Sequence, residues 1–130
     1  MLMTDGVRSA PPPRGVLITQ DLIFSTKVAD TARALGAEVA VASDVERAVG
    51  LARERMPGVV ILDLGLPEAD LAALVMRLRE AAGDVPVIAY GPHVDRDRFA
   101  AASAAGCDVL PRGRFSSSLP ELIRRYLGVG

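Results

Sequence analysis

Five short runs of aliphatic residues alternate along this chain with five longer segments whose apolar residues recur at helical spacing. Short apolar runs predict strands, and apolar residues at i, i+3, i+4 and i+7 predict helices. The expected strands cover residues 15–19, 38–42, 58–63, 85–90 and 107–111, and the expected helices lie near 22–35, 44–55, 68–82, 95–105 and 118–127. Parallel strands need crossover connections that shield both faces of a sheet. The alternation therefore predicts an α/β fold, a (βα)5 three-layer sandwich around a five-stranded parallel sheet.

The length and the punctuation of the chain predict one domain. A chain of 130 residues has an ordinary domain size, and with 50% hydrophobic but only 4% aromatic residues its core must be aliphatic. Residues 1–14 hold three consecutive prolines and show no periodicity, so they predict a flexible lead-in before a domain over 15–130. Two serines, Ser43 and Ser118, stand three residues before a glutamate, and this capping-box spacing predicts that helices begin there. Glycines follow four expected helices, at Gly36, Gly83, Gly106 and Gly128.

The bulk charge and the cysteine content exclude several classes of protein. The chain has 15 Lys and Arg against 16 Asp and Glu, and a net charge of −1 gives no field that attracts nucleic acid or an anionic membrane. The lone cysteine, Cys107, forms no internal disulfide, and no signal-peptide pattern opens the chain. No apolar run approaches the ~20 residues of a membrane-spanning helix. We therefore expect a cytoplasmic protein that binds neither nucleic acid nor membrane.

Acidic side chains follow two of the expected strands directly. Asp21 comes just after the first strand, and Asp63 ends the third, in the stretch VVILDLGLP of residues 59–67. In a parallel sheet the carboxyl ends of the strands meet at one edge, where a crevice opens at the reversal of strand order. Two carboxylates in such a crevice repel each other, and a divalent cation relieves the repulsion. Because Mg²⁺ is held by one or two carboxylates and keeps several waters, these acids predict a Mg²⁺ site.

Four stretches carry a resemblance to a known family: TQD (19–21), PGVVILDLGLP (57–67), VPVIAYG (85–91) and AGCDVLPRG (105–113). On these stretches, residues 15–128 resemble the receiver domain of bacterial two-component response regulators, which has flavodoxin-like topology. The resemblance implies a phosphoprotein of a phosphorelay in which Asp63 accepts a phosphoryl group from a partner histidine kinase. It also implies that Mg²⁺ lies between Asp63, the acids after the first strand and the backbone carbonyl of Gly65. We therefore expect a signalling protein and not an enzyme.

The resemblance is incomplete at five positions. The family usually has two acids after the first strand, and Gln20 takes the place of one, where it offers a neutral carbonyl oxygen and so only a weak Mg²⁺ ligand. Gly91 stands where a hydroxyl residue ends the fourth strand and contacts the phosphoryl group. Arg112 and Gly113 replace a lysine and a proline, and arginine keeps the charge but differs in reach and fork geometry. Val109 replaces an aromatic switch residue. These departures predict weak Mg²⁺ binding and weak or lost phosphorylation.

Two main functional interpretations follow. The first is an atypical receiver that accepts phosphate weakly at Asp63 and acts through contacts with a histidine kinase or a downstream target. The second is a pseudo-receiver that docks or dimerises without phosphorylation. A flavodoxin-type enzyme that binds a flavin or nucleotide is a minor alternative, because the loop TQDLIFS lacks the glycine that a phosphate cradle needs. The sequence ends at Gly130, just after the last expected helix, which predicts a stand-alone receiver whose output is contact with another protein.

Several residues keep a structural interpretation beside the functional one. Asp21 is also a good N-cap for the first helix, and the two roles are compatible. His93, in the loop after the fourth strand, is either a solvated side chain or a partner of Asp21 and Asp63 at a metal. The segment from Arg112 to Arg125 is locally basic. In receivers the surface of the fourth helix, fifth strand and fifth helix binds partners and twin subunits, so the resemblance makes the face of the fifth strand and fifth helix a candidate homodimer interface.

Overall fold

The computed structural model describes residues 11–129, so most of the expected lead-in and Gly130 lie outside the described residues. The strands are β1 (Arg14–Ile18), β2 (Glu38–Ala42), β3 (Val59–Asp63), β4 (Val87–Gly91) and β5 (Asp108–Pro111). The helices are α2 (Leu22–Ala34), α3 (Val45–Arg55), α4 (Leu71–Ala82), α5 (Arg96–Ala104), α6 (Arg112–Ser117) and α7 (Leu119–Leu127). Strands and helices alternate as the sequence predicts, and each of the first four expected helices agrees with an observed one to within a few residues.

All strands are parallel and form one sheet in the order β2-β1-β3-β4-β5. From β1, which lies between β2 and β3, the chain moves outward to the edge strand β2, returns past β1 to the central strand β3, and continues through β4 to β5. The reversal of direction lies between β1 and β3, whose C-terminal ends therefore form the crevice expected for Asp21 and Asp63. The predicted α/β sandwich with a five-stranded parallel sheet is confirmed.

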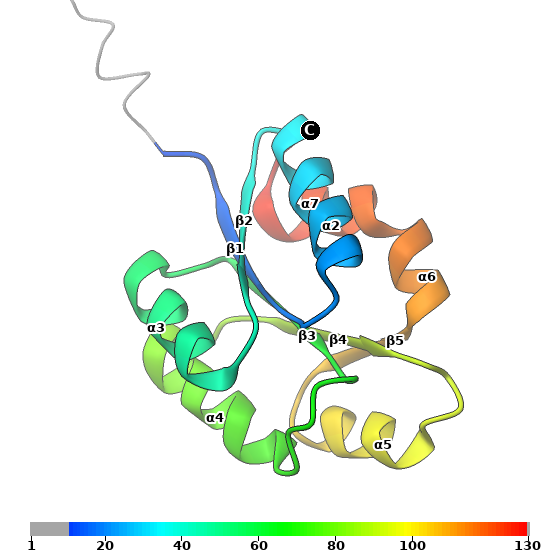
Figure 1. The fold of residues 1–130 in the computed structure, drawn as a ribbon. Coiled ribbons are helices and arrows are strands. Elements are labelled where there is room, and N and C mark those ends of the chain that lie inside the picture. Colours follow the sequence, from blue (N-terminus) through cyan, green and yellow to red (C-terminus); the bar gives the residue numbers. More distant parts are fainter. Residues whose placement is uncertain (1–10, 130) are drawn as a thin grey trace, which may run out of the picture.

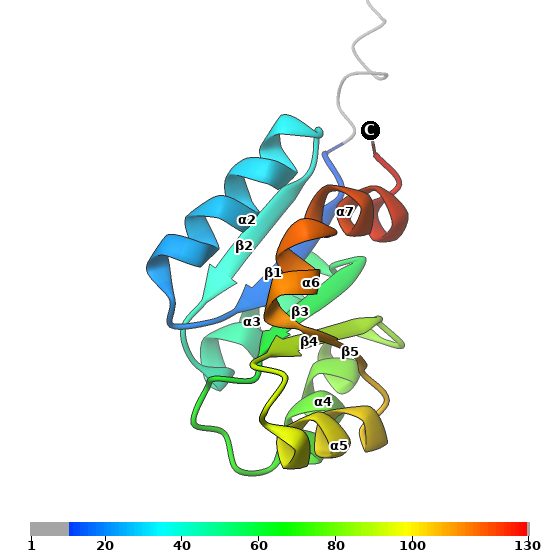
Figure 2. The ribbon, with the colours of Figure 1, turned by 90° about the vertical axis from the view of Figure 1, so that its right-hand side faces the viewer.

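Helices cover both faces of the sheet (Figures 1 and 2). On one face α3, α4 and α5 bury aliphatic residues against Val16, Val60 and Leu62. On the other face α2, α6 and α7 pack on Leu17 and Ile61. Every residue of β3 is buried, because β3 is the central strand and is covered on both sides. The core is mostly aliphatic, as the composition predicts, with one aromatic group on the α2 side.

Two predictions about helix starts are wrong in detail. The side chain that caps α3 belongs to Asp44 and not to Ser43, and it accepts the amide of Arg47 at 2.8 Å. Ser118 precedes α7 but makes no side-chain capping bond. An aspartate accepts amides at a helix start as well as serine does, so the sequence offered two adjacent caps for α3. The glycine ends are correct: Gly36 and Gly106 have φ of +89° and +93°, a conformation that favours glycine.

The short helix α6 was not predicted. Its sequence, RGRFSS, contains a glycine and shows no apolar periodicity, so local pattern gives no helix signal. The helix forms because Phe115 is fully buried between α2, β4 and α7, and this tertiary contact outweighs weak propensity. Its first residue is Arg112, so α6 decides where that guanidinium lies.

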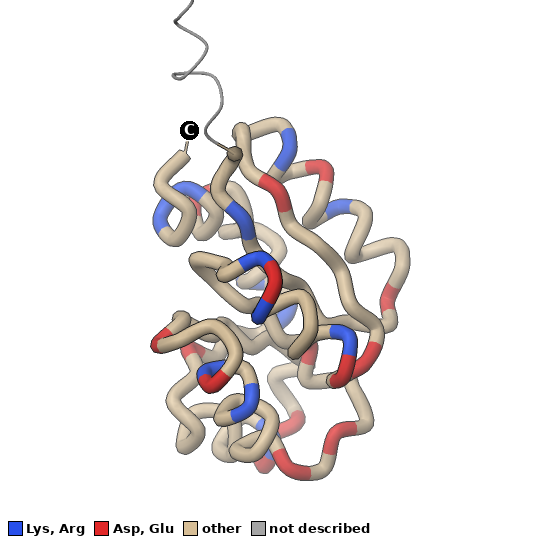
Figure 3. Tube along the Cα trace, turned by 90° about the vertical axis from the view of Figure 1, so that its left-hand side faces the viewer, with Lys and Arg blue, Asp and Glu red and all other residues tan. Residues whose placement is uncertain are grey.

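The charged residues form no single-sign surface on the side drawn in Figure 3, where basic and acidic positions are interspersed. Over residues 11–129, none of the helices has the length and apolar character needed to span a bilayer.

Candidate functional site

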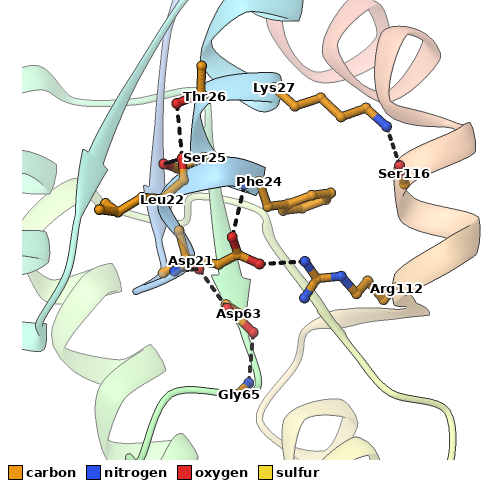
Figure 4. Close-up of polar contacts among 11 residues, drawn as sticks. Asp21, Leu22, Phe24, Ser25, Thr26, Lys27, Asp63, Gly65, Arg112 and Ser116 are labelled. Carbon is orange, nitrogen blue, oxygen red and sulfur yellow. Dashed lines mark hydrogen bonds and ion pairs between the residues drawn. The ribbon is translucent and has the colours of Figure 1, made fainter.

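The carboxylate of Asp63 lies at the C-terminal end of β3 and is only 8% exposed. Both of its oxygens accept hydrogen bonds. The hydroxyl of Thr19, which follows β1, donates to Oδ2 at 2.6 Å. The amide of Gly65 donates to Oδ1 at 2.8 Å (Figure 4). The sequence analysis placed Asp63 correctly at this edge but missed Thr19. The sequence contained a signal for Thr19. A hydroxyl residue that follows a buried strand by one position lies beside the residue that ends the neighbouring parallel strand, here Asp63.

Asp21 is the N-cap of α2 and is also an ion-pair partner. Its Oδ1 accepts the amide of Phe24 at 2.9 Å, and its Oδ2 accepts a 2.6 Å bond from Nη2 of Arg112 (Figure 4). The Phe24 amide and then the guanidinium hold the pKa of the Asp21 carboxyl below its usual value. The same pair raises the pKa of Arg112. The expected N-cap role of Asp21 is confirmed, and its role as a Mg²⁺ ligand stays a prediction. We call Thr19, Asp21, Asp63 and Arg112 the strand-end site.

An aromatic group supports the guanidinium. Arg112 lies over the ring of Phe24, with 4.6 Å between the guanidinium carbon and the ring centroid, a favourable cation–π arrangement. Phe24 packs in turn against Tyr90 and Phe115, which stack on each other with centroids 4.6 Å apart. Lys27 reaches the hydroxyl of Ser116 across the same gap between α2 and α6 (Figure 4). Arg112 is thus held by both an ion pair and an aromatic surface.

Tyr90 lies beside Asp63 in the sheet, because the two residues pair in the β3–β4 register. Its side chain is fully buried, and among the described residues its hydroxyl has no hydrogen-bond partner. Burial raises the pKa of the Tyr90 phenol, because the phenolate would lose its hydration. The sequence analysis did not single out Tyr90, since nothing in VPVIAY distinguishes a buried hydroxyl from a core ring.

The residues of this site do not fit a divalent cation as they are arranged. All four carboxylate oxygens of Asp21 and Asp63 already accept bonds from protein donors. Gln20 is exposed, and its amide donates to the carbonyl of Ser43 at 3.2 Å. Gly65 contacts Asp63 through its amide. Within residues 11–129 no three His, Cys, Asp or Glu side chains come together as a metal-binding group. A cation must therefore compete with these donors for the carboxylate charge, above all with the positively charged guanidinium of Arg112.

Gly91 ends β4 close to Leu64. A Cβ added at Gly91 would stand 3.0 Å from Cβ of Leu64, which is tighter than ordinary side-chain contacts. Leu64 is 2% exposed and cannot move aside without disturbing the core. The missing hydroxyl at this position therefore has a packing reason. Val109 is half-buried and packs on the α4 side of the sheet. Because its side chain is aliphatic, no aromatic ring can change position there.

Arg98, on α5, binds the loop after Asp63. Its guanidinium donates to the carbonyls of Leu64, Leu66 and Glu68 at 2.7, 3.0 and 2.9 Å. The loop that carries Gly65 is thus tied to α5. The sequence analysis missed Arg98, and no local pattern marks it, because its partners are backbone carbonyls. His93, for which the sequence left a solvated role and a metal-partner role open, is exposed in the turn after β4, and no hydrogen bond joins it to Asp21 or Asp63 in the part of the chain that the structure describes.

The basic segment is partly neutralised. Arg112 pairs with Asp21, and Arg125 approaches Glu121 at 3.5 Å. A groove of about 350 Å³ runs along the edge strand β5 beneath α6 and α7. Apolar and charged side chains both line it, among them Leu110, Leu122, Tyr126, Arg114, Glu121 and Arg125.

Comparison with known proteins gives a consistent result. The family model of the response regulator receiver domain matches residues 16–111. The transcriptional regulatory protein PrrA of Mycobacterium tuberculosis is 32% identical over 106 residues, which cover 82% of this chain and 44% of that protein. The chain thus spans less than half the length of this curated relative.

Solved receiver domains share the fold. The receiver domain of a sensor histidine kinase from Pseudomonas aeruginosa, described with a magnesium ion coordinated in its active site cleft, superposes with a TM-score of 0.74 at 22% identity, covering 90% of this chain and 98% of that one. A response regulator from Thermotoga maritima gives a TM-score of 0.74 at 22% identity, with the same coverage of 90% and 98%.

Proposed function

We propose, since this chain belongs to the response regulator receiver family of two-component signalling, that it is an atypical receiver that acts through protein–protein contacts in a phosphorelay. Asp63 is the candidate phosphoacceptor, and its phosphorylation is weak. One observation carries the proposal: the Asp63 carboxylate ends the central strand of the sheet, yet each of its oxygens already accepts a hydrogen bond. The cytoplasmic location expected from the lone cysteine belongs to the same proposal.

Phosphorylation requires an oxygen of Asp63 to attack the phosphorus of a donor such as acetyl phosphate. A new O–P bond forms while the P–O bond to acetate breaks, and acetate leaves with the electron pair of that bond. Each hydrogen bond to the carboxylate stabilises its negative charge and occupies a lone pair, so the attacking oxygen is less nucleophilic. The 8% exposure of Asp63 also restricts the approach of a donor. Both effects slow the reaction.

Weak Mg²⁺ binding is part of the proposal. Carboxylates are the ligands that Mg²⁺ prefers, and Asp21 and Asp63 lie at one edge of the sheet. Their oxygens are engaged by Arg112, Thr19 and backbone amides, which already stabilise the negative charge that a cation would neutralise. The cation must share or displace these donors, and this lowers its affinity.

A second candidate function is docking or dimerisation that does not depend on phosphorylation. The packing of Gly91 on Leu64 and the small side chain of Val109 favour it. A phosphoryl group shifts a conformational equilibrium only if it contacts the two states differently. Without a hydroxyl at Gly91 or a ring at Val109, such differential contacts are few.

Neither candidate is an enzyme. A bound flavin or nucleotide phosphate would use the free amides at the start of α2. Asp21 caps that helix with its own carboxylate, which accepts the Phe24 amide and repels an anion.

The groove along β5 is the surface that we assign to partner docking. An edge strand offers unpaired backbone groups, and β5 is an edge strand of this sheet. The partner is a histidine kinase, a downstream target or a second copy of this chain. Arg114 and Arg125 line the groove, so the contact should weaken as salt is raised, because exposed charges are screened over ~8 Å at physiological ionic strength.

Intact mass after incubation with acetyl phosphate and Mg²⁺ tests the proposal. We expect a slow and partial gain of one phosphoryl group in the wild type and none in Asp63→Asn. No gain in the wild type favours the docking function without phosphorylation. Rapid and complete phosphorylation contradicts the weak-acceptor proposal, and an equal gain in Asp63→Asn places the acceptor at another residue.

A further inference from the structure

Arg112 differs from the other donors of the strand-end site in charge and in origin. The carboxylate oxygens of Asp63 and Oδ1 of Asp21 are bound by a hydroxyl and by backbone amides, which are neutral. Oδ2 of Asp21 is bound by the Arg112 guanidinium, which carries a full positive charge. The two residues are 91 positions apart, so the contact joins the first residue of α6 to the N-cap of α2.

Two contacts hold the guanidinium of Arg112 in the site. It makes a 2.6 Å contact with Asp21 and lies 4.6 Å from the centroid of the Phe24 ring. Phe24 is 7% exposed and cannot turn away, because Tyr90 and Phe115 pack against it. The side chain of Arg112 is itself 44% exposed, so it has a free path out of the site toward solvent. The guanidinium can therefore leave without unfolding α6.

A divalent cation and the guanidinium compete for the same oxygen. At Asp21, Oδ1 is shared with the Phe24 amide that the helix start requires, and a cation bound at Oδ2 would meet the Arg112 guanidinium directly. A divalent cation and a guanidinium bound to the same carboxylate oxygen would lie next to each other, and their positive charges would repel strongly. Gln20 adds no second charge to reduce that repulsion.

We propose that Arg112 is the resident cation of the strand-end site: its guanidinium occupies Asp21 and excludes a divalent cation, which enters only when Arg112 swings out. The inference rests on the proposed function only because both concern the strand-end site. It holds whether or not Asp63 is phosphorylated. The positive charge of the strand-end site is then supplied by a side chain of α6 and not by a bound ion.

The test is a Mg²⁺ titration of the wild type and of Arg112→Gln, read by the thermal unfolding midpoint and by Mn²⁺-induced broadening of amide resonances near Asp21 and Asp63. We expect Arg112→Gln to bind Mg²⁺ about 1.5-fold to fivefold more tightly than the wild type, the range given by releasing one partly exposed charge pair. The Asp21→Asn, Arg112→Gln double variant should lose that gain, because the contested oxygen is then uncharged.

Arg114→Gln is the matched control, since it removes the same charge from the same helix and Arg114 makes no contact with either acid in the described chain. An equal gain of affinity in Arg114→Gln would overturn the proposal, because the effect would then be one of net charge. An Arg112→Gln variant that binds Mg²⁺ no more tightly than the wild type would overturn it as well.

A measurement on the wild type keeps the inference testable if Arg112→Gln does not fold. Nuclear Overhauser contacts between the Arg112 side chain and the Phe24 ring should disappear in proportion to Mg²⁺ occupancy. Contacts that persist at saturating Mg²⁺ would contradict displacement. Because these experiments contain no phosphodonor, their failure leaves the phosphorylation proposal standing, and a failure of phosphorylation leaves this inference standing.

Discussion

The Thr19 hydroxyl donates a 2.6 Å hydrogen bond to Oδ2 of Asp63, and the two residues are 1% and 8% exposed. The same hydroxyl accepts the amide of Asp21 at 3.0 Å. Thr19 thus connects the two acids of the site through one hydroxyl, which donates to the side chain of Asp63 and accepts the backbone amide of Asp21.

Replacing this hydroxyl should destabilise the fold. Valine has nearly the shape of threonine, so Thr19→Val removes the hydrogen bond and leaves a buried carboxylate oxygen without its donor. We expect the free energy of unfolding in urea to fall by about 1.5–3 kcal/mol, the range for hydrogen bonds to charged groups. Thr26→Val is the control, because its exposed hydroxyl bonds only the Leu22 carbonyl within α2 and its loss should cost less than ~0.5 kcal/mol. Equal losses in both variants would show that the bond to Asp63 contributes nothing.

The two tyrosines should respond in opposite directions to loss of their hydroxyls. Tyr90 has a buried hydroxyl without a partner in the described chain, and phenylalanine keeps its stacking on Phe115. Tyr90→Phe should therefore raise the free energy of unfolding by about 1 kcal/mol. Tyr126 donates to Asp108 at 2.8 Å, so Tyr126→Phe should lower it by about 0.5–1.5 kcal/mol. A loss in Tyr90→Phe as large as that in Tyr126→Phe would reveal a bound partner for the Tyr90 hydroxyl.

Tyr90 also predicts how stability changes at alkaline pH. Burial raises the pKa of its phenol above the 10.0 of an exposed tyrosine. Above the pKa of an exposed tyrosine, the unfolded chain loses the phenolic proton while the folded chain retains it. The free energy of unfolding therefore falls as the pH rises toward the pKa of the folded state. Unfolding in urea between about pH 9 and about pH 11 should show a decline that is shallower in Tyr90→Phe, by at most ~1.4 kcal/mol per pH unit. Identical slopes in the two proteins would mean that the phenol ionises normally in the fold.

The sequence could predict the layers of the fold because they depend on repeated local patterns. The apolar runs before Asp21 and Asp63 predicted the end of β3 at Asp63 and the end of β1 to within one residue, and the family resemblance agreed with that arrangement. It could not predict α6, because that helix depends on where Phe115 is buried. It could predict that Arg112 keeps a positive charge near the acids. It could not predict that Arg112 pairs with Asp21, since that depends on the position of α6.

Two contacts of the site were beyond sequence reasoning for a common reason. Arg98 binds three carbonyls, and carbonyls carry no sequence signal. In the sequence, Gly91 indicates only that the hydroxyl residue of the family is missing. In the fold, Gly91 is the residue that lets Leu64 pack against β4. Whether a position has lost a function or gained a packing role is decided by its spatial neighbours.

Adding a side chain at Gly91 should be destabilising rather than restorative. Gly91→Ala places a Cβ at 3.0 Å from Cβ of Leu64, and such overpacking costs about 1–3 kcal/mol. Gly113→Ala is the matched control, because nothing lies within 4 Å of its added Cβ and alanine favours α6 by about 0.5–1 kcal/mol. Thermal and urea unfolding should therefore shift in opposite directions for the two variants. If both are equally stabilising, the site has room for a hydroxyl residue.

A double-mutant cycle tests the assigned cause. Leu64→Ala alone should be strongly destabilising, because it opens a cavity in the core. In the Leu64→Ala background, Gly91→Ala should cost about 0.5 kcal/mol or more less than in the wild type, since the two residues are in contact. Strict additivity would contradict the clash.

The last prediction concerns the link between α5 and the loop after Asp63. Arg98→Lys keeps the charge but replaces the three nitrogens that bind the three carbonyls, Nε, Nη1 and Nη2, by one ammonium nitrogen, which cannot span all three acceptors. Three amides report on this loop: those of Leu64, Gly65 and Leu66 donate to Tyr90, to the Asp63 side chain and to the Asp63 carbonyl. Hydrogen exchange at these amides should accelerate by about tenfold, which corresponds to ~1.4 kcal/mol of local opening. Arg96→Lys, an exposed arginine on the same helix, should leave the rates unchanged. If the loop exchanges at the wild-type rate in Arg98→Lys, it holds its shape without Arg98, and the Gly65 donor to Asp63 is independent of α5.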